Sequence, residues 1–347
     1  MKRSRHLTIY IFCLLSSTLH AQRPETLFYI VDQEDCFQSF KANIKQIDIV
    51  GPQAYNMDEH GILWGSVDRR VMELAKANNV KVMPLVINPG FNQPMFHTLL
   101  HDSAAQEYAV HEMLRVCKEN KYYGLQFDYE NIHVSDKDAF TAFYRKTADL
   151  LHKNGFAISI AVVPRTSDDP GPTSYHKWIF EYWRGAYDYK ALAEIGDFLS
   201  FMTYEQHTHR TTPGPVAGIP WMEQSLAFVL KDVPPGKISL GIPFFSNYWQ
   251  PYAHGDEVHV SGRGMDYAEA RGLIEEFRAK VVWDEDEQVN FVKYDNKDLY
   301  EYIYLEDAKS LKPKLDLMRK HKLRGISVWR LGHEDPDVWK VIQKELR

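Results

Sequence analysis

Short runs of β-branched and aromatic residues alternate with longer stretches of helical periodicity from residue 26 to the end of the chain. The runs predict eight strands, at residues 27–31, 47–53, 81–87, 123–130, 157–163, 197–204, 237–244 and 324–331. The stretches predict helices at 37–45, 68–78, 103–119, 136–154, 187–195, 221–230, 307–321 and 336–345. This alternation favours a closed parallel (β/α)8 TIM barrel. An open Rossmann-type sheet is disfavoured because no Gly-rich phosphate loop follows the first strand.

One interval, residues 246–305, departs from this repeat. It lies between the seventh strand and the following helix and contains a helical stretch at 267–277 and three short strand-like pieces at 280–283, 289–294 and 301–304. A loop this long in a compact domain usually has structure of its own. We therefore expect a small α+β insertion on the rim of the barrel, walling a cleft.

The N-terminal segment has the pattern of a secretory signal. A basic start at residues 2–5 precedes an apolar run at 7–15 that is too short to span a bilayer, and small and polar residues follow. We expect cleavage near Ala21, leaving a catalytic chain of residues 22–347. The expected location is secreted or periplasmic, without stable membrane insertion.

Composition narrows the class further. With 44% apolar and 25% charged residues, the chain is neither collagen-like nor disordered nor a multi-span membrane protein. Removing the three positive charges of residues 1–21 changes the net charge from −6 to −9, which argues against a nucleic-acid partner. Cys36 and Cys117 then remain. Two buried thiols are favoured because Cys117 shares an apolar helix stripe with Val110 and Leu114, and a single disulfide stays open.

The fourth expected strand carries an unusual polar row. Its apolar side chains share one face: Leu125, Phe127 and Tyr129. Gln126, Asp128 and Glu130 share the other, which must face the barrel axis because the outer face meets the helices. Residues at i and i+2 have their Cα atoms about 7 Å apart, close enough for two carboxylates to raise each other's pKa, as the proton donor of a glycosidase requires. The alternative is a pair of rim residues in salt bridges, but the C-terminal ends of barrel strands typically carry catalytic groups.

Aromatic residues on two other strands share the parity of axis-facing positions. If Ser200 and Ser327 face the axis, Tyr204 and Trp329 do too, at the same end as Glu130. Flat rings beside paired carboxylates are typical of a sugar site, and the alternative is that both rings belong to the barrel core.

These motifs resemble glycoside hydrolase family 18. The fourth strand is similar to the family signature Asp-x-x-Asp-x-Asp-x-Glu, with Glu130 at the acid position and Asp128 at the last aspartate. Tyr123 and Gln126 stand in place of the first two aspartates. Residues 202–205 resemble the family's Met-x-Tyr-Asp segment with Glu205 for Asp.

Two further segments, 237–244 and 325–329, resemble the seventh and eighth strands of that family. Within it, the nearest resemblance is to the branch that cuts bacterial cell-wall glycan, of the spore-cortex and germination type. Gln126 argues against a standard chitinase more than against activity.

The resemblance implies a retaining, substrate-assisted hydrolysis of β-linked N-acetylglucosaminyl bonds in peptidoglycan or chitin-type glycans. Glu130 would protonate the leaving oxygen, Asp128 would orient the acetamido group and Tyr204 would hydrogen-bond its oxygen. Trp329 would hold the sugar ring. The candidate substrate contacts are Gln126, Trp329, Glu205, Tyr55 and Trp249. The rival interpretation is a glycan-binding barrel of the same family without turnover.

Histidines suggest little additional chemistry. His97 and His101 are spaced i, i+4 without a Glu-bearing zinc signature, so they are expected to be surface or packing residues. No metal or other cofactor is expected. His207 and His209 follow the sixth strand and are candidates to line the cleft.

Overall fold

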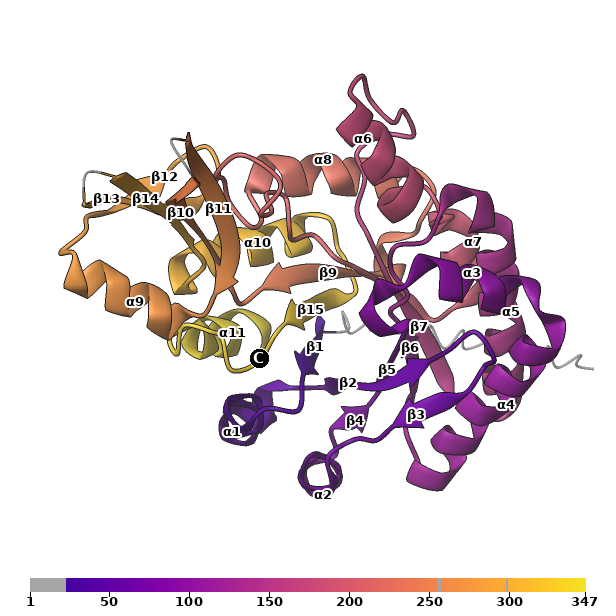
Figure 1. Cartoon of the computed structure of the whole chain (residues 1–347). Coiled ribbons are helices and arrows are strands. Elements are labelled where there is room, and N and C mark those ends of the chain that lie inside the picture. Colours follow the sequence, from indigo (N-terminus) through magenta and orange to yellow (C-terminus); the bar gives the residue numbers. More distant parts are fainter. Residues whose placement is uncertain (1–22, 255–256, 298) are drawn as a thin grey trace, which may run out of the picture.

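The computed structural model describes residues 23–254, 257–297 and 299–347, which form a barrel and a second, smaller sheet (Figure 1). The expected signal segment lies outside the described residues. Among those described, no helix is both long and apolar enough to cross a bilayer.

The barrel is closed, parallel and eight-stranded, as predicted. Its strands are β1 (Glu25–Ile30), β2 (Ile49–Met57), β4 (Lys81–Val82) continued by β5 (Leu85–Ile87), β6 (Gly124–Phe127), β7 (Ala157–Val162), β8 (Phe198–Phe201), β9 (Ile238–Pro243) and β15 (Gly325–Trp329). They pair in the order β1-β15-β9-β8-β7-β6-β5-β2, and β1 also pairs with β2, which closes the cylinder. The expected third strand is split at Pro84, which has no N–H for the ladder.

Helices cover the outside of the cylinder (Figure 1). Eight correspond to those expected: α1 (Glu34–Asn43), α2 (Arg69–Asn78), α4 (Ser103–Asn120), α5 (Lys137–Lys153), α7 (Tyr189–Ile195), α8 (Ile219–Val229), α10 (Ala308–Lys320) and α11 (Val338–Leu346). Three elements were not predicted from the sequence pattern: β3 (Leu63–Gly65), α3 (Gln93–His101) and α6 (Ser174–Ile179). Helix α6 continues into a π-helical turn at Phe180–Arg184. Short 3-10 turns lie at Ile44–Gln46, Pro89–Phe91, Val134–Asp136 and Pro235–Lys237.

Side chains along the barrel strands point alternately outward, toward the helices, and inward, into the barrel. On the outer face of β6, the Phe127 ring lies 5.6 Å from that of Phe143 on α5, and just past the strand Tyr129 stacks on Phe96 of α3 at 4.3 Å. A separate buried cluster fills the inside of the barrel: Leu27, Tyr29, Ile49, Met83, Leu85 and Phe198. The outward row of β6 therefore packs on helices, which leaves its polar row to the axis.

Cys36 and Cys117, which lie in the described part of the chain, are both buried and free. Cys117 lies on the buried stripe of α4, as its spacing with Val110 and Leu114 indicated. The interpretation as two buried thiols is thereby confirmed over a disulfide.

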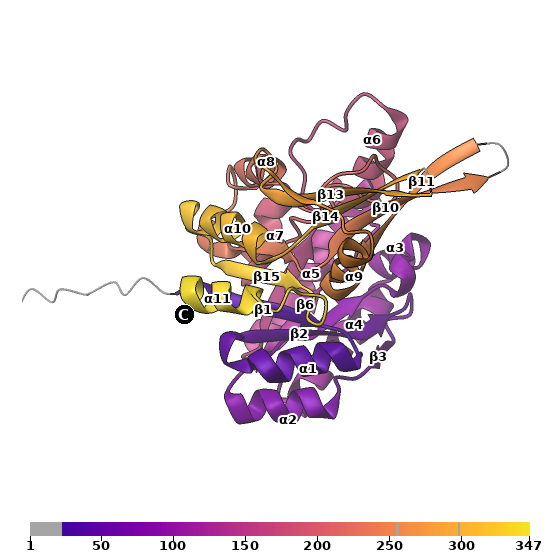
Figure 2. The ribbon, with the colours of Figure 1, turned by 90° about the vertical axis from the view of Figure 1, so that its left-hand side faces the viewer.

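The expected α+β insertion is present between β9 and α10. Its antiparallel sheet has the order β11-β10-β14-β13-β12, formed by β10 (Ser246–His254), β11 (Glu257–Met265), β12 (Val281–Asp284), β13 (Val289–Asn296) and β14 (Leu299–Leu305). Helix α9 (Tyr267–Glu276) packs on one face of it through a cluster that includes Tyr248, Ile274 and Ile303. The hairpin of β10 and β11, which the sequence pattern missed, extends well beyond the other strands (Figure 2).

Candidate active site

The polar row of β6 points into the barrel. Gln126 is fully buried, its Oε1 accepts a hydrogen bond from the Tyr29 hydroxyl at 2.6 Å, and its Nε2 donates to Ser159 Oγ at 2.8 Å. Asp128 follows the last residue of the strand, Phe127, and is 5% exposed. The amide of Gln126 is thus occupied by the barrel interior, and Asp128 is the first group of the row at the mouth.

Glu130 is held by its main chain. The Nδ2 of Asn88, which follows β5, donates to the Glu130 carbonyl at 2.8 Å, and its Oδ1 accepts from the Glu130 N–H at 3.0 Å. Asn88 is itself fully buried. This double contact fixes the direction in which the half-buried Glu130 side chain leaves the backbone. Asn88 was not predicted from the sequence, because its position directly after a strand was the one sequence feature that pointed to it.

Electrostatics keep a proton on the acid pair. Burial raises the pKa of Asp128 to about 7. Burial, followed by the negative charges of Asp128 and Glu205, raises the pKa of Glu130 well above its ordinary value. Neither carboxyl is offset by an arginine or lysine among the described residues, so the salt-bridged alternative does not apply. A carboxylic acid that stays protonated near neutral pH is suited to donate a proton.

Tyr204 and Glu205 lie on a sharp turn after β8. The strand ends at Phe201, the N–H of Tyr204 bonds to the carbonyl of Met202 at 2.7 Å, and Glu205 has a φ of +60°. Strand parity therefore stops before these two residues, and both interact electrostatically with Glu130. Burial, together with the charges of Tyr29, Asp128 and Glu130, raises the pKa of Tyr204, which keeps its hydroxyl protonated as a hydrogen-bond donor.

Tyr29 connects the remaining groups. Its ring lies 5.5 Å from that of Trp329 at the end of β15, and its hydroxyl lies 2.6 Å from Ser200 Oγ. Burial and the charge of Asp128 both raise its pKa. The structure thus brings Asp128, Glu130, Tyr204 and Trp329 to one end of the barrel around this phenol. Sequence reasoning missed Tyr29, although its parity with Leu27 on β1 was available as a signal.

Tyr55 does not join this group, which corrects its assignment as a substrate contact. The pairing of β2 with β5 shifts register between Gln53 and Tyr55. Such a bulge reverses the facing of the residues beyond it. The Tyr55 hydroxyl therefore lies on the helix side, 2.9 Å from that of Tyr122.

Trp249 is a second correction. It lies on β10 with 1% of its surface exposed, packed across Gly262 and 5.8 Å from the ring of Tyr304. A ring without an open face cannot stack on a sugar. Of the two histidines considered for the cleft, His209 lies where its positive charge would lower the pKa of Glu205, whereas His207 bonds through Nδ1 to the Thr212 carbonyl.

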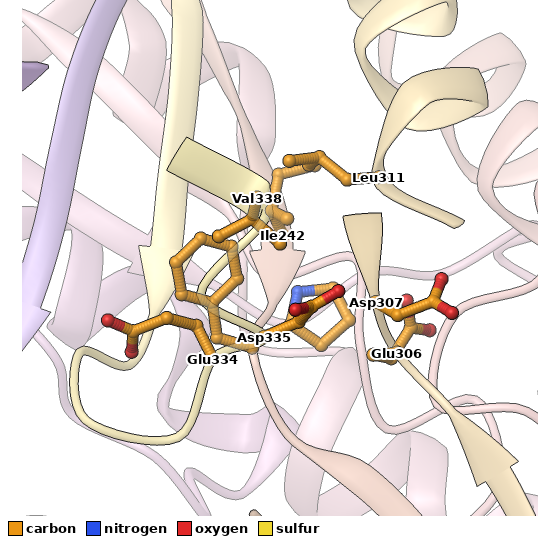
Figure 3. Close-up of a pocket in the computed structure, with 9 residues that line it drawn as sticks. Ile242, Glu306, Asp307, Leu311, Glu334, Asp335 and Val338 are labelled. Carbon is orange, nitrogen blue, oxygen red and sulfur yellow. The ribbon is translucent and has the colours of Figure 1, made fainter. Parts of the chain in front are cut away.

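A small cavity lies apart from this site, where β9 meets α10 and α11 (Figure 3). It is lined by Ile242, Pro243, Phe244, Glu306, Asp307, Leu311, Glu334, Asp335 and Val338. Three of its four acidic groups accept hydrogen bonds from the local backbone, and the fourth, Glu306, pairs with Lys314. Asp307 caps α10, Asp335 accepts from the N–H of Ala308, and Glu334 accepts from that of Gly332. The cavity is therefore structural.

Comparisons with known proteins agree with this architecture. The chain is 26% identical to the cortical fragment-lytic enzyme of Bacillus subtilis (strain 168) over 317 residues, which cover 90% of this chain and 71% of that protein. It is 22% identical to the uncharacterized glycosylase YvbX of the same organism, covering 92% and 90% of the two chains.

Among solved structures, the spore cortex-lytic enzyme SleL of Bacillus megaterium QM B1551 superposes with a TM-score of 0.82 at 25% identity, covering 93% of this chain and 74% of that one. A chitinase from Chromobacterium violaceum ATCC 12472 shares the fold, with a TM-score of 0.83 at 22% identity and coverage of 93% and 99%. The profile of the glycosyl hydrolases family 18 matches residues 33–334. Because that match spans most of the chain, the protein belongs to glycosyl hydrolase family 18 and is a glycosidase.

Proposed function

We propose that this protein is a retaining, substrate-assisted glycosidase that cleaves β-linked N-acetylglucosaminyl bonds, with bacterial peptidoglycan as its substrate class. One observation carries the proposal: Glu130 lies at the barrel mouth with a raised pKa, next to a second acid. Relatives named for lysis of the spore cortex favour a wall glycan over chitin. The basic and apolar start of the sequence supports export to reach such a substrate.

In this mechanism Glu130 protonates the glycosidic oxygen of the leaving sugar. The acetamido oxygen of the substrate attacks the anomeric carbon from the opposite face, which breaks the glycosidic bond and forms an oxazolinium ring. Asp128 orients the acetamido N–H and balances the positive charge, while Tyr204 donates a hydrogen bond to the acetamido oxygen. Glu130, now ionised, removes a proton from the water that opens the ring, so the anomeric configuration is retained.

The sugar itself would rest on Trp329, whose partly exposed ring lies beside Tyr29 at the base of the site. Because the nucleophile belongs to the substrate, the cleaved unit must carry an N-acetyl group. Cellulose and starch are thereby excluded.

The test compares wild type with Glu130→Gln on purified peptidoglycan and on chitin oligomers, with analysis of the new reducing ends. We expect wild type to release reducing N-acetylglucosamine ends and the variant to lose at least about a hundredfold in rate, the usual scale for a positioned proton donor. Equal activity of the two proteins would overturn the assignment of Glu130. Binding of glycan by both, without product from either, would instead establish the rival non-hydrolytic barrel.

A further inference from the structure

Three potential metal ligands meet on the outer side of the barrel, between α3 and the start of α5. His97 and His101 lie one turn apart on α3, and Asp136 directly precedes α5. Asp136 Oδ1 and Oδ2 each lie 2.9 Å from His97 Nδ1, and Oδ1 lies 3.0 Å from His101 Nε2. The ligand atoms of the three residues all lie within 4.8 Å of one another. The i, i+4 spacing alone indicated only surface histidines, because the third group comes from a distant part of the chain.

The carboxylate of Asp136 is committed to the two imidazoles. It occupies the N-cap position of α5, yet it accepts no hydrogen bond from the first turn of that helix. It is 2% exposed, and in the described part of the chain its ion-pair partners are the two histidines, with no lysine or arginine. A buried carboxylate requires a compensating cation. A metal ion bound by the three side chains would supply that positive charge.

We propose that His97, His101 and Asp136 bind one divalent transition-metal ion of the zinc class. Imidazole nitrogen and carboxylate oxygen are ligands that Zn²⁺ accepts, and residues at i and i+4 of a helix present both imidazoles on one face. Tetrahedral zinc with ligands at about 2.1 Å holds neighbouring ligand atoms about 3.4 Å apart. The two separations between Asp136 and the histidines, 2.9 and 3.0 Å, require an adjustment of about half an ångström. The two histidine nitrogens lie within 4.8 Å of each other.

The surroundings leave room for that adjustment and for a further ligand. The side chains of His97 and His101 are 50% and 53% exposed, so no packed core resists a small shift of the rings and water has access to the remaining coordination position. Asp136, in contrast, is fixed by its burial. The metal would therefore cross-link two exposed ligands on α3 to a buried one at the start of α5.

Such an ion would stabilise rather than catalyse. Asp136 lies six residues after Glu130 on the connection from β6 to α5, and Asn131 of that connection donates from Nδ2 to the Phe91 carbonyl just before α3. A metal on Asp136 adds a second tie between α3 and this connection. The inference does not depend on the proposed sugar chemistry.

The experiment titrates Co²⁺ and Zn²⁺ into purified protein that carries no polyhistidine tag and has been stripped with a chelator. We expect one Co²⁺ per chain with a visible absorption band, displacement of that band by Zn²⁺, and a rise of Tm with Zn²⁺ concentration by mass action. His97→Ala and His101→Ala should each weaken binding at least about tenfold, a loss seen even for groups that only orient a ligand. Asp136→Asn should do the same.

His111→Ala is the matched control. This histidine is also exposed, and it pairs with Glu107 at i, i+4 on α4 without a third ligand, so its loss should leave metal binding unchanged. The proposal is overturned if wild type binds no stoichiometric ion, or if the His97 and His101 variants bind as tightly as wild type. A loss of Tm in those variants without any metal binding by wild type would identify the cluster as an ion pair only, which also overturns it.

Discussion

The side-chain amide of Asn88 bonds to both polar backbone groups of Glu130: it donates to the Glu130 carbonyl at 2.8 Å and accepts from the Glu130 N–H at 3.0 Å. The two residues are 42 positions apart and lie just beyond the ends of the neighbouring barrel strands β5 and β6. One buried side-chain amide therefore sets the position of the proposed proton donor without touching its carboxyl group.

Asn88→Ala should reduce kcat about 10- to 100-fold with little change in KM, because the acid loses its alignment while the sugar contacts remain. Leaving the two backbone groups without their partner should also cost about 1–3 kcal/mol of stability. Steady-state kinetics on chitin oligomers well below the Tm separate the two effects. Asn154→Ala is the control, since its amide bonds to the Leu150 carbonyl at the exposed end of α5. A kcat equal to wild type would show that Asn88 only supports the fold.

Glu205→Gln should move the basic limb of the pH profile of kcat/KM to lower pH. The reaction requires protonated Glu130, so activity falls as the pH rises through the pKa of that group. The charge of Glu205 raises this pKa, and its removal therefore lowers it. Glu205 is an exposed residue, so solvent screening limits the size of this shift while its direction stays downward.

Profiles of wild type, Glu205→Gln and Glu194→Gln measure this effect. Glu194 is an exposed residue of α7, so its substitution removes the same charge from a surface helix and should leave the limb in place. A basic limb that stays or moves to higher pH in Glu205→Gln would contradict the electrostatic account.

Trp329→Ala should raise KM for N-acetylglucosamine oligomers at least about tenfold, because the sugar loses the ring on which it would rest. Trp249→Phe should leave KM unchanged and lower stability by about 1–3 kcal/mol, as expected for a smaller ring at a buried position. Kinetics and thermal unfolding of both variants distinguish a contact from a packing residue. A raised KM in Trp249→Phe at unchanged stability would restore its original assignment.

The barrel was predictable because its information is local. In residues 123–130 the alternation of apolar and polar side chains reports which face meets α3 and α5, and the same logic at Ser200 and Ser327 gives the facing of their strands. The insertion was predictable in outline, since its helix is amphipathic. The two strands of the β10–β11 hairpin were not predicted, because their glycines and polar residues interrupt the apolar pattern of a strand.

The site was less predictable because it depends on departures from that regularity. A bulge in β2 turned Tyr55 outward, and the turn after β8, which includes the positive φ of Glu205, ended strand parity before Tyr204 and Glu205. Asn88 and Tyr29 act through contacts with segments far away in the chain, which no local pattern records.

The buried ion pair between Lys314 and Glu306 joins the insertion to the barrel helices. Glu306 follows β14, and its Oε2 accepts from Lys314 Nζ of α10 at 2.6 Å, with side chains 3% and 0% exposed. Lys314→Met should therefore cost about 3–5 kcal/mol, because it strands a buried carboxylate, whereas a double variant that adds Glu306→Leu should recover most of the loss.

The pH dependence of that loss gives a further test. Burial raises and Lys314 lowers the pKa of Glu306, so in Lys314→Met the pKa rises further. The folded variant then binds a proton that the unfolded chain releases, and its stability must fall as the pH rises from about 4.3, the ordinary Glu value, through the raised pKa. Denaturant unfolding between pH 5 and 8 measures this slope. Lys312→Met is the control, because its pair with Asp316 is 55% and 50% exposed and should contribute under about 1 kcal/mol. A loss no larger than that of the control would show that the buried pair contributes nothing to anchoring the insertion.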